Sequence, residues 1–309
     1  MGNVPLDQVG LVSIIIESLI FGISTAMFAA VLRIVLFQAS FRWNSFGLAL
    51  PVMSLIWILS AGHWVVDIVR IEQAFLHEPD RIAYLADISD SLEAAKIGIY
   101  VTVTLIGDCF MIYRCWVVWR KAYLVVIFPV LLWLCSGISG YGGTHALSLT
   151  KQGGIFLAEL VPWITTFFST SLATNVICTL LIAYRILQSQ MAVRNTRVAQ
   201  SRVMSAMIIF LESAALYSST LIALLITYQL GSNVQFIIVD LTSPLIGITF
   251  NMILLRLVGE RASSAEISTG PAHASARGEG VNVSRLVEVV RDNGYEMESF
   301  RDRVKMGDV

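Results

Sequence analysis

The chain has 309 residues and a net charge of −1, and it is 56% hydrophobic but only 14% charged, with a mean hydropathy of +0.73. Soluble domains carry about 25% charged residues, so this composition argues against an ordinary water-soluble protein. The near-zero net charge gives no sign of nucleic-acid binding. We therefore expect a membrane protein whose first partner is the lipid bilayer, with no nucleic-acid partner.

Seven segments are long and apolar enough to cross a bilayer, which takes about 20 residues. They lie at about 12–36, 47–69, 94–118, 123–139, 156–183, 203–228 and 234–257. Each should be helical, because unpaired backbone groups cannot face lipid. The predicted fold is an all-α membrane protein, a seven-transmembrane helix bundle over residues 1–258. A cytosolic tail over 259–309 is rich in Ser, Gly, Ala, Arg and Glu and is expected to be mostly disordered.

Basic residues in the predicted loops indicate the orientation, because loops rich in Lys and Arg stay on the cytosolic side. The loops after the first, third, fifth and seventh spans lie on one side of the membrane, and eleven Lys and Arg residues fall on that side. Four fall on the opposite side. The predicted loop at 70–93 is acidic, which agrees with an outside position. We expect an outside N-terminus, a cytosolic C-terminus and a multi-pass location in the plasma membrane.

The stretch at 105–121 places an acid inside the third span and ends in aromatic and basic residues. A carboxylate in hydrocarbon is costly, so Asp108, near mid-depth, is expected to find a partner on another helix or to be protonated. Asp108 and Arg114 are six residues apart and therefore about 120° apart around the helix, which excludes the usual local ion pair. Tyr113 and Arg114 are expected to anchor the cytosolic end of this helix.

Ionisable side chains recur within the predicted spans, mostly in the outer third. His63 and Asp67 lie four residues apart, on one helical face. Because acids outnumber bases at this depth, we expect an acidic outward-facing cavity that takes a cation, a proton or an amine-bearing ligand. The predicted ligand or ion cavity comprises Asp108, Asp67, His63, Asp240, Glu212, Lys96, Glu17 and Glu159. Alternatively, these groups lie near the lipid headgroups, or pair with helix hydroxyls, and serve only packing.

The cytosolic face carries a second set of candidate residues, which would couple to a signalling protein or anchor the helices. These residues are Arg114, Tyr113, Arg194, Arg197 and Arg202. A basic loop of this kind also follows from the orientation rule alone, so it favours a receptor only weakly.

Two further spans carry polar features with two interpretations each. The fifth span contains small polar residues between 165 and 175, which either promote close helix packing or line a ligand site. The seventh contains Pro244, which is expected to kink the helix, either as a static bend or as a moving part.

The sequence lacks the residues that several functions of membrane proteins require. A retinal-type Schiff base requires a lysine in the seventh span, and there is none. The four cysteines show no metal-type spacing and are expected to be small buried packing residues. Only His63 among the four histidines falls clearly inside a span, so a histidine-based metal hydrolase is not expected. We expect no enzyme, no catalytic residue, no metal and no cofactor.

Two strings, I-G-D-C-F-M-I-Y-R-C-W-V-V-W at 106–119 and I-I-V-D-L-T-S-P-L-I-G-I-T-F-N-M-I-L-L-R-L at 237–257, carry a resemblance to a known group. The chain resembles a family of uncharacterised seven-pass integral membrane proteins of basidiomycete fungi, over about 12–257. The resemblance implies a seven-helix membrane protein, receptor-like in character. It implies no particular activity.

The topology is also distantly similar to that of G-protein-coupled receptors, which carry an acidic-Arg-Tyr triplet at the cytosolic end of the third helix. Here Tyr113-Arg114 occupies that place, but Ile112 stands where an acid would be expected. No loop cysteine exists to bridge to the third helix, and Pro244 lies high in the seventh span. Helix count and one arginine are weak grounds for a function.

Three functional interpretations remain at this point. The first is a receptor-like sensor, in which an acidic outer cavity binds a small cationic or amphipathic ligand and the basic face contacts a cytosolic signalling protein. The second is a transporter or lipid-handling protein that uses intramembrane acids as a proton or cation relay. The third is a structural membrane protein without a small-molecule site.

Overall fold

The computed structural model describes residues 4–37, 49–87, 90–149, 160–192 and 197–268, and within these ranges it is helical with no strand. Seven of the helices are long and apolar enough to cross a membrane, which confirms that part of the predicted fold. The helices are α1 (Leu6–Phe37), α2 (Ala49–Leu76), α3 (Arg81–Ala86), α4 (Ser91–Val118), α5 (Tyr123–Leu149), α6 (Val161–Ala192), α7 (Arg197–Gln229) and α8 (Val234–Ser268).

The chain divides into two compact units, Met1–Arg261 and Ala262–Val309. The last helix ends at Ser268, past the predicted end of the membrane domain at residue 258. The rest of the predicted tail lies outside the described residues. The helix bundle and all of the candidate site residues with described side chains belong to the first unit.

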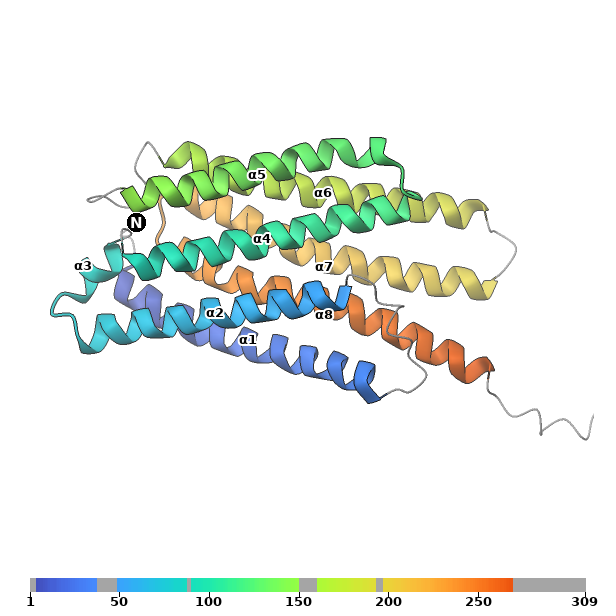
Figure 1. The fold of residues 1–309 in the computed structure, drawn as a ribbon, viewed down its shortest axis with the longest axis horizontal. Coiled ribbons are helices and arrows are strands. Elements are labelled where there is room, and N and C mark those ends of the chain that lie inside the picture. Colours follow the sequence, from blue (N-terminus) through green and yellow to red (C-terminus); the bar gives the residue numbers. More distant parts are fainter. Residues whose placement is uncertain (1–3, 38–48, 88–89, 150–159, 193–196, 269–309) are drawn as a thin grey trace, which may run out of the picture. The chain divides into compact units, whose positions relative to one another are not determined.

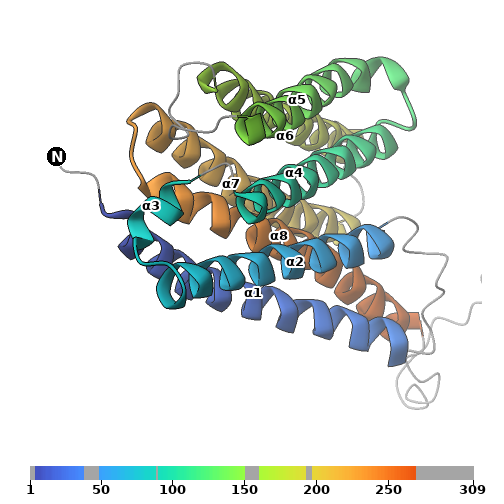
Figure 2. The same ribbon diagram turned by 60° about the vertical axis from the view of Figure 1, so that its left-hand side comes forward.

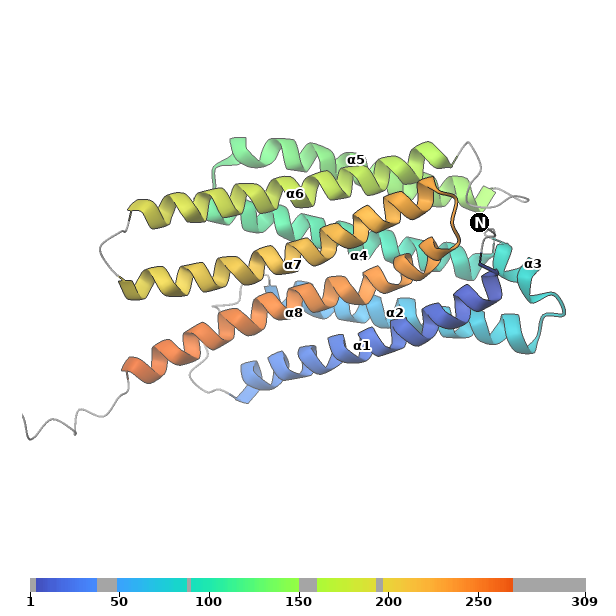
Figure 3. The same cartoon turned by 180° about the vertical axis from the view of Figure 1, so that it is seen from behind.

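Within the first unit, α4 occupies a central place. It packs against α2, α5 and α6, and Figure 2 shows it between α2 and α5. Seen from behind, α6, α7, α8 and α1 follow one another side by side (Figure 3). The start of α8 meets the start of α1, since the Asn233 side chain donates a hydrogen bond to the Val4 carbonyl over 2.9 Å.

One end of this bundle is formed by the first turns of α1, α4 and α8 and the last turns of α2, and we call it the amino-terminal end. The short helix α3 lies there, next to α1 and α2 (Figure 1). Asp80 caps α3 by accepting a hydrogen bond from the Ala83 N–H over 3.1 Å. Buried ion pairs that join α2 to α4 and α4 to α8 gather at this amino-terminal end.

The helix α5 runs to Leu149, beyond the predicted end of its span at residue 139. Glycines in this added part let α6 approach closely. A Cβ atom built on Gly140 would lie 2.8 Å from Val101 and 3.0 Å from Phe167, and one on Gly142 would lie 2.6 Å from Trp163. Hydropathy therefore underestimates the length of this helix, because the glycines that lower the mean hydropathy are the residues that allow tight helix packing.

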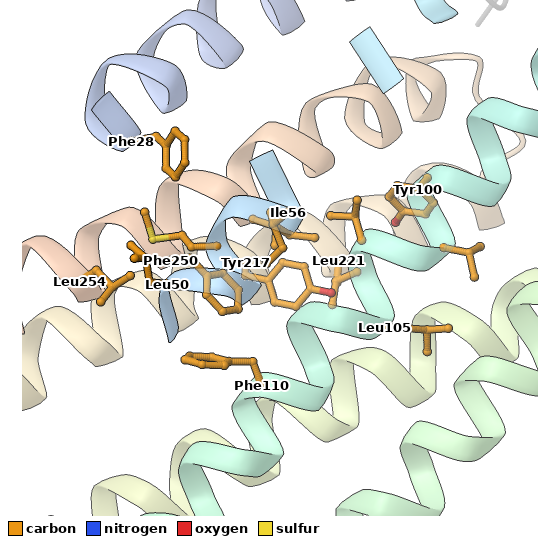
Figure 4. Close-up of a cluster of buried hydrophobic side chains, with 14 of the residues drawn as sticks. Phe28, Leu50, Ile56, Tyr100, Leu105, Phe110, Tyr217, Leu221, Phe250 and Leu254 are labelled. Carbon is orange, nitrogen blue, oxygen red and sulfur yellow. The ribbon is translucent and has the colours of Figure 1, made fainter. Parts of the chain in front are cut away.

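Apolar side chains from most of the long helices fill the middle of the bundle (Figure 4). The rings of Phe110 of α4 and Phe250 of α8 pack together, with their centroids 4.9 Å apart and their planes tilted by 52°. Leu221 of α7 and Ile56 of α2 are fully buried in the same cluster. This apolar centre separates the charged amino-terminal end from the opposite end of the helices.

The close packing at Gly140 leads to a stability prediction. Gly140→Ala should lower the thermal unfolding midpoint, because overpacking costs about 1–3 kcal/mol, which exceeds the gain in helix propensity of at most about 1 kcal/mol. Gly98→Ala is the matched control, since a Cβ there meets nothing within 4 Å. Thermal unfolding of both variants in detergent measures the difference. A Gly140→Ala variant as stable as Gly98→Ala would contradict the packing of α5 against α4 and α6.

Candidate functional site

A buried lysine is the hub of the charges at the amino-terminal end. The Lys96 ammonium on α4 lies 2.5 Å from Asp67 Oδ1 on α2 and 2.7 Å from Asp240 Oδ1 on α8. Ser13 on α1 donates a hydrogen bond to Asp240 Oδ2 over 2.5 Å. All four side chains are buried. A charge withdrawn from water needs such partners, so these contacts hold four helices in one arrangement.

A second pair lies on the same face of α2, one turn before Asp67. His63 Nδ1 lies 2.8 Å from Glu17 Oε1 on α1, and neither residue is exposed at all. The other polar atoms of this group, Glu17 Oε2, Asp67 Oδ2 and His63 Nε2, have no hydrogen-bond partner among the described residues. One ligand atom each from Glu17, Asp67 and Asp240 lie within 4.8 Å of one another.

A third ion pair extends this network to the end of the bundle. Arg70 on α2 lies 2.8 Å from Glu93 on α4, and its guanidinium also donates to the backbone carbonyl of Leu85 in α3 over 3.1 Å. The hydropathy pattern placed both residues in an outside loop. Their spacing carried a signal, because Arg70 follows Asp67 by three residues and Glu93 precedes Lys96 by three, which puts each on the face of its charged neighbour.

These seven residues are here called the charge network: Glu17, His63, Asp67, Arg70, Glu93, Lys96 and Asp240. It contains four carboxylates and two permanent cations, besides one histidine. With a neutral histidine the network holds an excess of two negative charges. Buried charges are normally paired, so this excess needs compensation by protons or by a bound cation.

Asp108 lies apart from the charge network, in the middle of α4. It is fully buried and accepts a hydrogen bond from Ser171 on α6 over 2.6 Å. The Ser171 hydroxyl lies in turn 3.1 Å from the Tyr217 hydroxyl on α7. Asp108 Oδ1 has no hydrogen-bond partner among the described residues. The expected partner on another helix is therefore a hydroxyl group, and the fifth span supplies it.

A polar stripe on α4 connects the hub to Asp108. Lys96, Tyr100, Thr104 and Asp108 follow one another at every fourth position, and all four are buried. Residues four apart are neighbours on a helix surface, and each step of four turns by about 40°, so this stripe winds around α4 by about 120° from Lys96 to Asp108. The described residues offer no well-formed hydrogen bond to the Tyr100 and Thr104 hydroxyls. Buried hydroxyls in this state are commonly satisfied by internal water.

The other predicted cavity residues lie elsewhere. Glu212 is exposed on α7, so it does not face Asp108 and does not share a proton with it. Glu159 lies outside the described residues. The structure thus brings together Glu17, His63, Asp67, Lys96 and Asp240 of the predicted set, places Asp108 apart and turns Glu212 outward.

The predicted coupling residues are described only in part. Arg114 is partly buried, and Tyr113 next to it is 37% exposed. Aromatic rings surround this end of α4, with the centroids of Tyr113 and Trp116 6.2 Å apart. Arg194 and the side chains of Arg197 and Arg202 lie outside what the structure describes.

The cysteines do not all match the expected buried packing role. Cys115 and Cys178 are buried, but Cys109 and Cys135 are exposed on the outer faces of their helices. Thiols are apolar enough to face lipid, and hydropathy alone does not distinguish a lipid-facing position from a buried one.

A pocket of about 80 Å³ opens beside the charge network, between α4, α5, α6, the end of α7 and the start of α8. Its walls are mainly aromatic and aliphatic, and they include Tyr100, Phe167 and Phe168. Glu93 and Gln235 supply polar groups, and Gln235 Nε2 is buried with no hydrogen-bond partner among the described residues. An apolar lining with a few polar groups is the composition of small-molecule sites, and a volume of about 80 Å³ admits only a very small molecule.

Comparisons with protein-family models, with curated proteins and with solved structures find no match.

The hub leads to a stability prediction. Lys96→Met should lower the thermal unfolding midpoint strongly, because removing one partner of a buried ion pair costs about 3–5 kcal/mol. Lys121→Met is the matched control, since Lys121 is exposed at the end of α4. Thermal unfolding in detergent compares the two. Equal small effects would show that the ammonium is not needed to hold Asp67 and Asp240 together.

Proposed function

We propose that the chain is a receptor-like sensor of the plasma membrane, with its N-terminus outside and its C-terminus cytosolic. One observation carries this proposal. The pocket is lined by Glu93 of the charge network and by Tyr100 of the polar stripe, and it also includes Val239, which directly precedes Asp240. A molecule bound in the pocket would therefore contact Glu93, which pairs α4 with Arg70 of α2, and would contact the residue next to Asp240.

The chemistry of the pocket indicates the class of ligand. Its apolar walls suit an apolar body, while Glu93 and the unpartnered Gln235 amide suit a small polar or cationic end. A cationic group next to Glu93 would compete with Arg70 for that carboxylate. We propose a small amphipathic amine as the ligand class.

The charge network provides a way to convert binding into helix movement. If a ligand takes Glu93, Arg70 loses its ion pair, and the contact between the end of α2 and the start of α4 weakens. The adjacent hub, Lys96 with Asp67 and Asp240, would then be free to rearrange. A ligand shifts a conformational equilibrium only by contacting the two states differently, and this exchange of partners supplies such a difference.

Two further parts of the proposal concern the cytosolic side and the relatives of the chain. The basic residues after α6 and the aromatic end of α4 would face the cytosol and contact a signalling protein. The strings at 106–119 and 237–257 support membership in the family of seven-pass membrane proteins of basidiomycete fungi. The first string contains Asp108 and the second contains Asp240, so each includes one of the buried acids.

The ligand proposal is testable by thermal shift. Amines with an apolar body, screened against the purified protein, should raise its unfolding midpoint, and Gln235→Leu should weaken the hits because the amide is lost. Gln229→Leu serves as the control, since Gln229 is exposed. A screen in which no amine protects the wild type, or in which both variants respond alike, would exclude this pocket as the ligand site.

A second candidate function is a proton or cation relay, which the polar stripe on α4 favours. Lys96, Tyr100, Thr104 and Asp108 would form a path from the charge network into the middle of the bundle, with water joining the hydroxyls. Acids, hydroxyls and buried water at membrane depth are the components of proton pathways. The path would end at Ser171 and Tyr217, which surround Asp108.

The relay predicts a measurable flux. Wild-type protein in vesicles that contain a pH-sensitive dye should carry protons under an imposed gradient. Asp108→Asn should abolish the flux, because the amide cannot take up and release a proton. Glu212→Gln is the control, since Glu212 is exposed on α7. If the wild type carries no current, the relay fails and the receptor proposal is unaffected.

A further inference from the structure

We propose that Glu17, Asp67 and Asp240 bind a divalent cation of about the size of calcium at the amino-terminal end of the bundle. The inference uses the charge network of the proposed function, but it requires neither a ligand in the pocket nor a signalling partner. The three carboxylates come from α1, α2 and α8, so the bound ion would join helices that are far apart in the sequence.

The spacing of the three carboxylates suits such an ion. Their ligand atoms lie within 4.8 Å of one another. Calcium binds oxygen at about 2.3–2.6 Å, so two oxygens on opposite sides of the ion are about 4.6–5.2 Å apart. Magnesium keeps several of its waters and is usually bound through one or two carboxylates in near-ideal octahedral geometry, so three carboxylates from three helices suit it less well. Carboxylate oxygens are the ligands that both ions prefer.

The unpartnered atoms provide a second observation that points to a ligand. Glu17 and Asp67 are 0% and 2% exposed, yet Glu17 Oε2 and Asp67 Oδ2 have no hydrogen-bond partner among the described residues. The other oxygen of each group is held, by His63 on Glu17 and by Lys96 on Asp67. The free oxygens are thus fixed in position, and leaving them buried without a partner would cost free energy.

The charge of the network favours a divalent ion over a monovalent one. Arg70 and Glu93 neutralise each other, and Lys96 compensates only one of the three remaining carboxylates. One divalent ion removes the excess of two negative charges with a neutral His63. One monovalent ion would leave a negative charge in the interior.

Protons alone balance the network less well. They would have to occupy either two carboxylates, at least one of which is a partner of Lys96, or one carboxylate and His63. A charged imidazole carries an N–H at Nε2, and that atom has no hydrogen-bond partner among the described residues. In the neutral form, the Nδ1–H of His63 donates to Glu17 and orients this carboxylate. His63 is therefore a positioning residue for the cation, in the way that outer groups orient metal ligands.

Calcium binding can be measured on the full-length protein in detergent after treatment with a chelator. Calcium chloride should raise the thermal unfolding midpoint at fixed pH, and choline chloride of the same ionic strength should not. Glu17→Gln should raise the calcium concentration needed for half of the effect by about tenfold or more. Glu72→Gln, a change of an exposed acid on α2, should leave it within about twofold. Magnesium should act only at higher concentration than calcium.

A direct measurement keeps the inference testable if Glu17→Gln does not fold. Equilibrium dialysis with radioactive calcium should give about one ion bound per wild-type chain, and the absence of binding would overturn the inference. The inference would also fail if Glu17→Gln and Glu72→Gln need the same calcium concentration for half of the effect. It would fail as well if lowering the pH without calcium raises the unfolding midpoint by the same amount. Calcium binding without any protective amine would leave the cation site standing while the ligand proposal fails, so the two are separable.

Discussion

The ammonium of Lys96 between the carboxylates of Asp67 and Asp240 is the contact on which the rest of the amino-terminal end depends. Removing these three charges from water is costly, and only their mutual attraction offsets the cost. The arrangement therefore forms only when α2, α4 and α8 meet in one rotation and one register. The hub thereby selects one packing of these helices, because a rotated or shifted helix would leave a charge buried alone.

Polar contacts have this importance because the hydrophobic effect does not drive one membrane helix against another; lipid is as apolar as a leucine side chain. Elsewhere in the bundle single hydrogen bonds join neighbouring helices. Trp133 on α5 donates to the Leu105 carbonyl of α4 over 2.9 Å, and Asn251 on α8 donates to the Ser24 carbonyl of α1 over 3.0 Å. Between these points, small residues and interlocked rings supply van der Waals packing. The charge network is the exception, since its members hold several helices at once.

Hydropathy was enough to predict seven spanning helices, because bilayer thickness sets a length that a single sequence reveals. It could also predict which acids lie at similar depth, but not which of them face one another. Asp108 and Glu212 illustrate the limit: Tyr217 and Ser213 occupy the inner face of α7, and Glu212 is turned outward. The depth of a residue in the membrane follows from its position along the helix. The direction in which its side chain points depends on the rotation of the helix about its own axis, which packing against neighbouring helices determines. Hydropathy places Arg70 and Glu93 in a loop and so does not reveal their ion pair, although α2 and α4 extend to include them.

The two acidic centres differ in a way that bears on function. The charge network contains both cations and carboxylates in ion pairs, so its members can exchange partners without any net movement of charge through the bundle. Asp108 has only hydroxyl neighbours, Ser171 and Tyr217, and a change in its charge would have no ionic partner nearby among the described residues. The first arrangement suits a device that changes shape when an ion or ligand binds, and the second suits a group that takes up and releases a proton. Because α4 carries both centres, a shift of this helix at the hub would also move Asp108 relative to its hydroxyl partners.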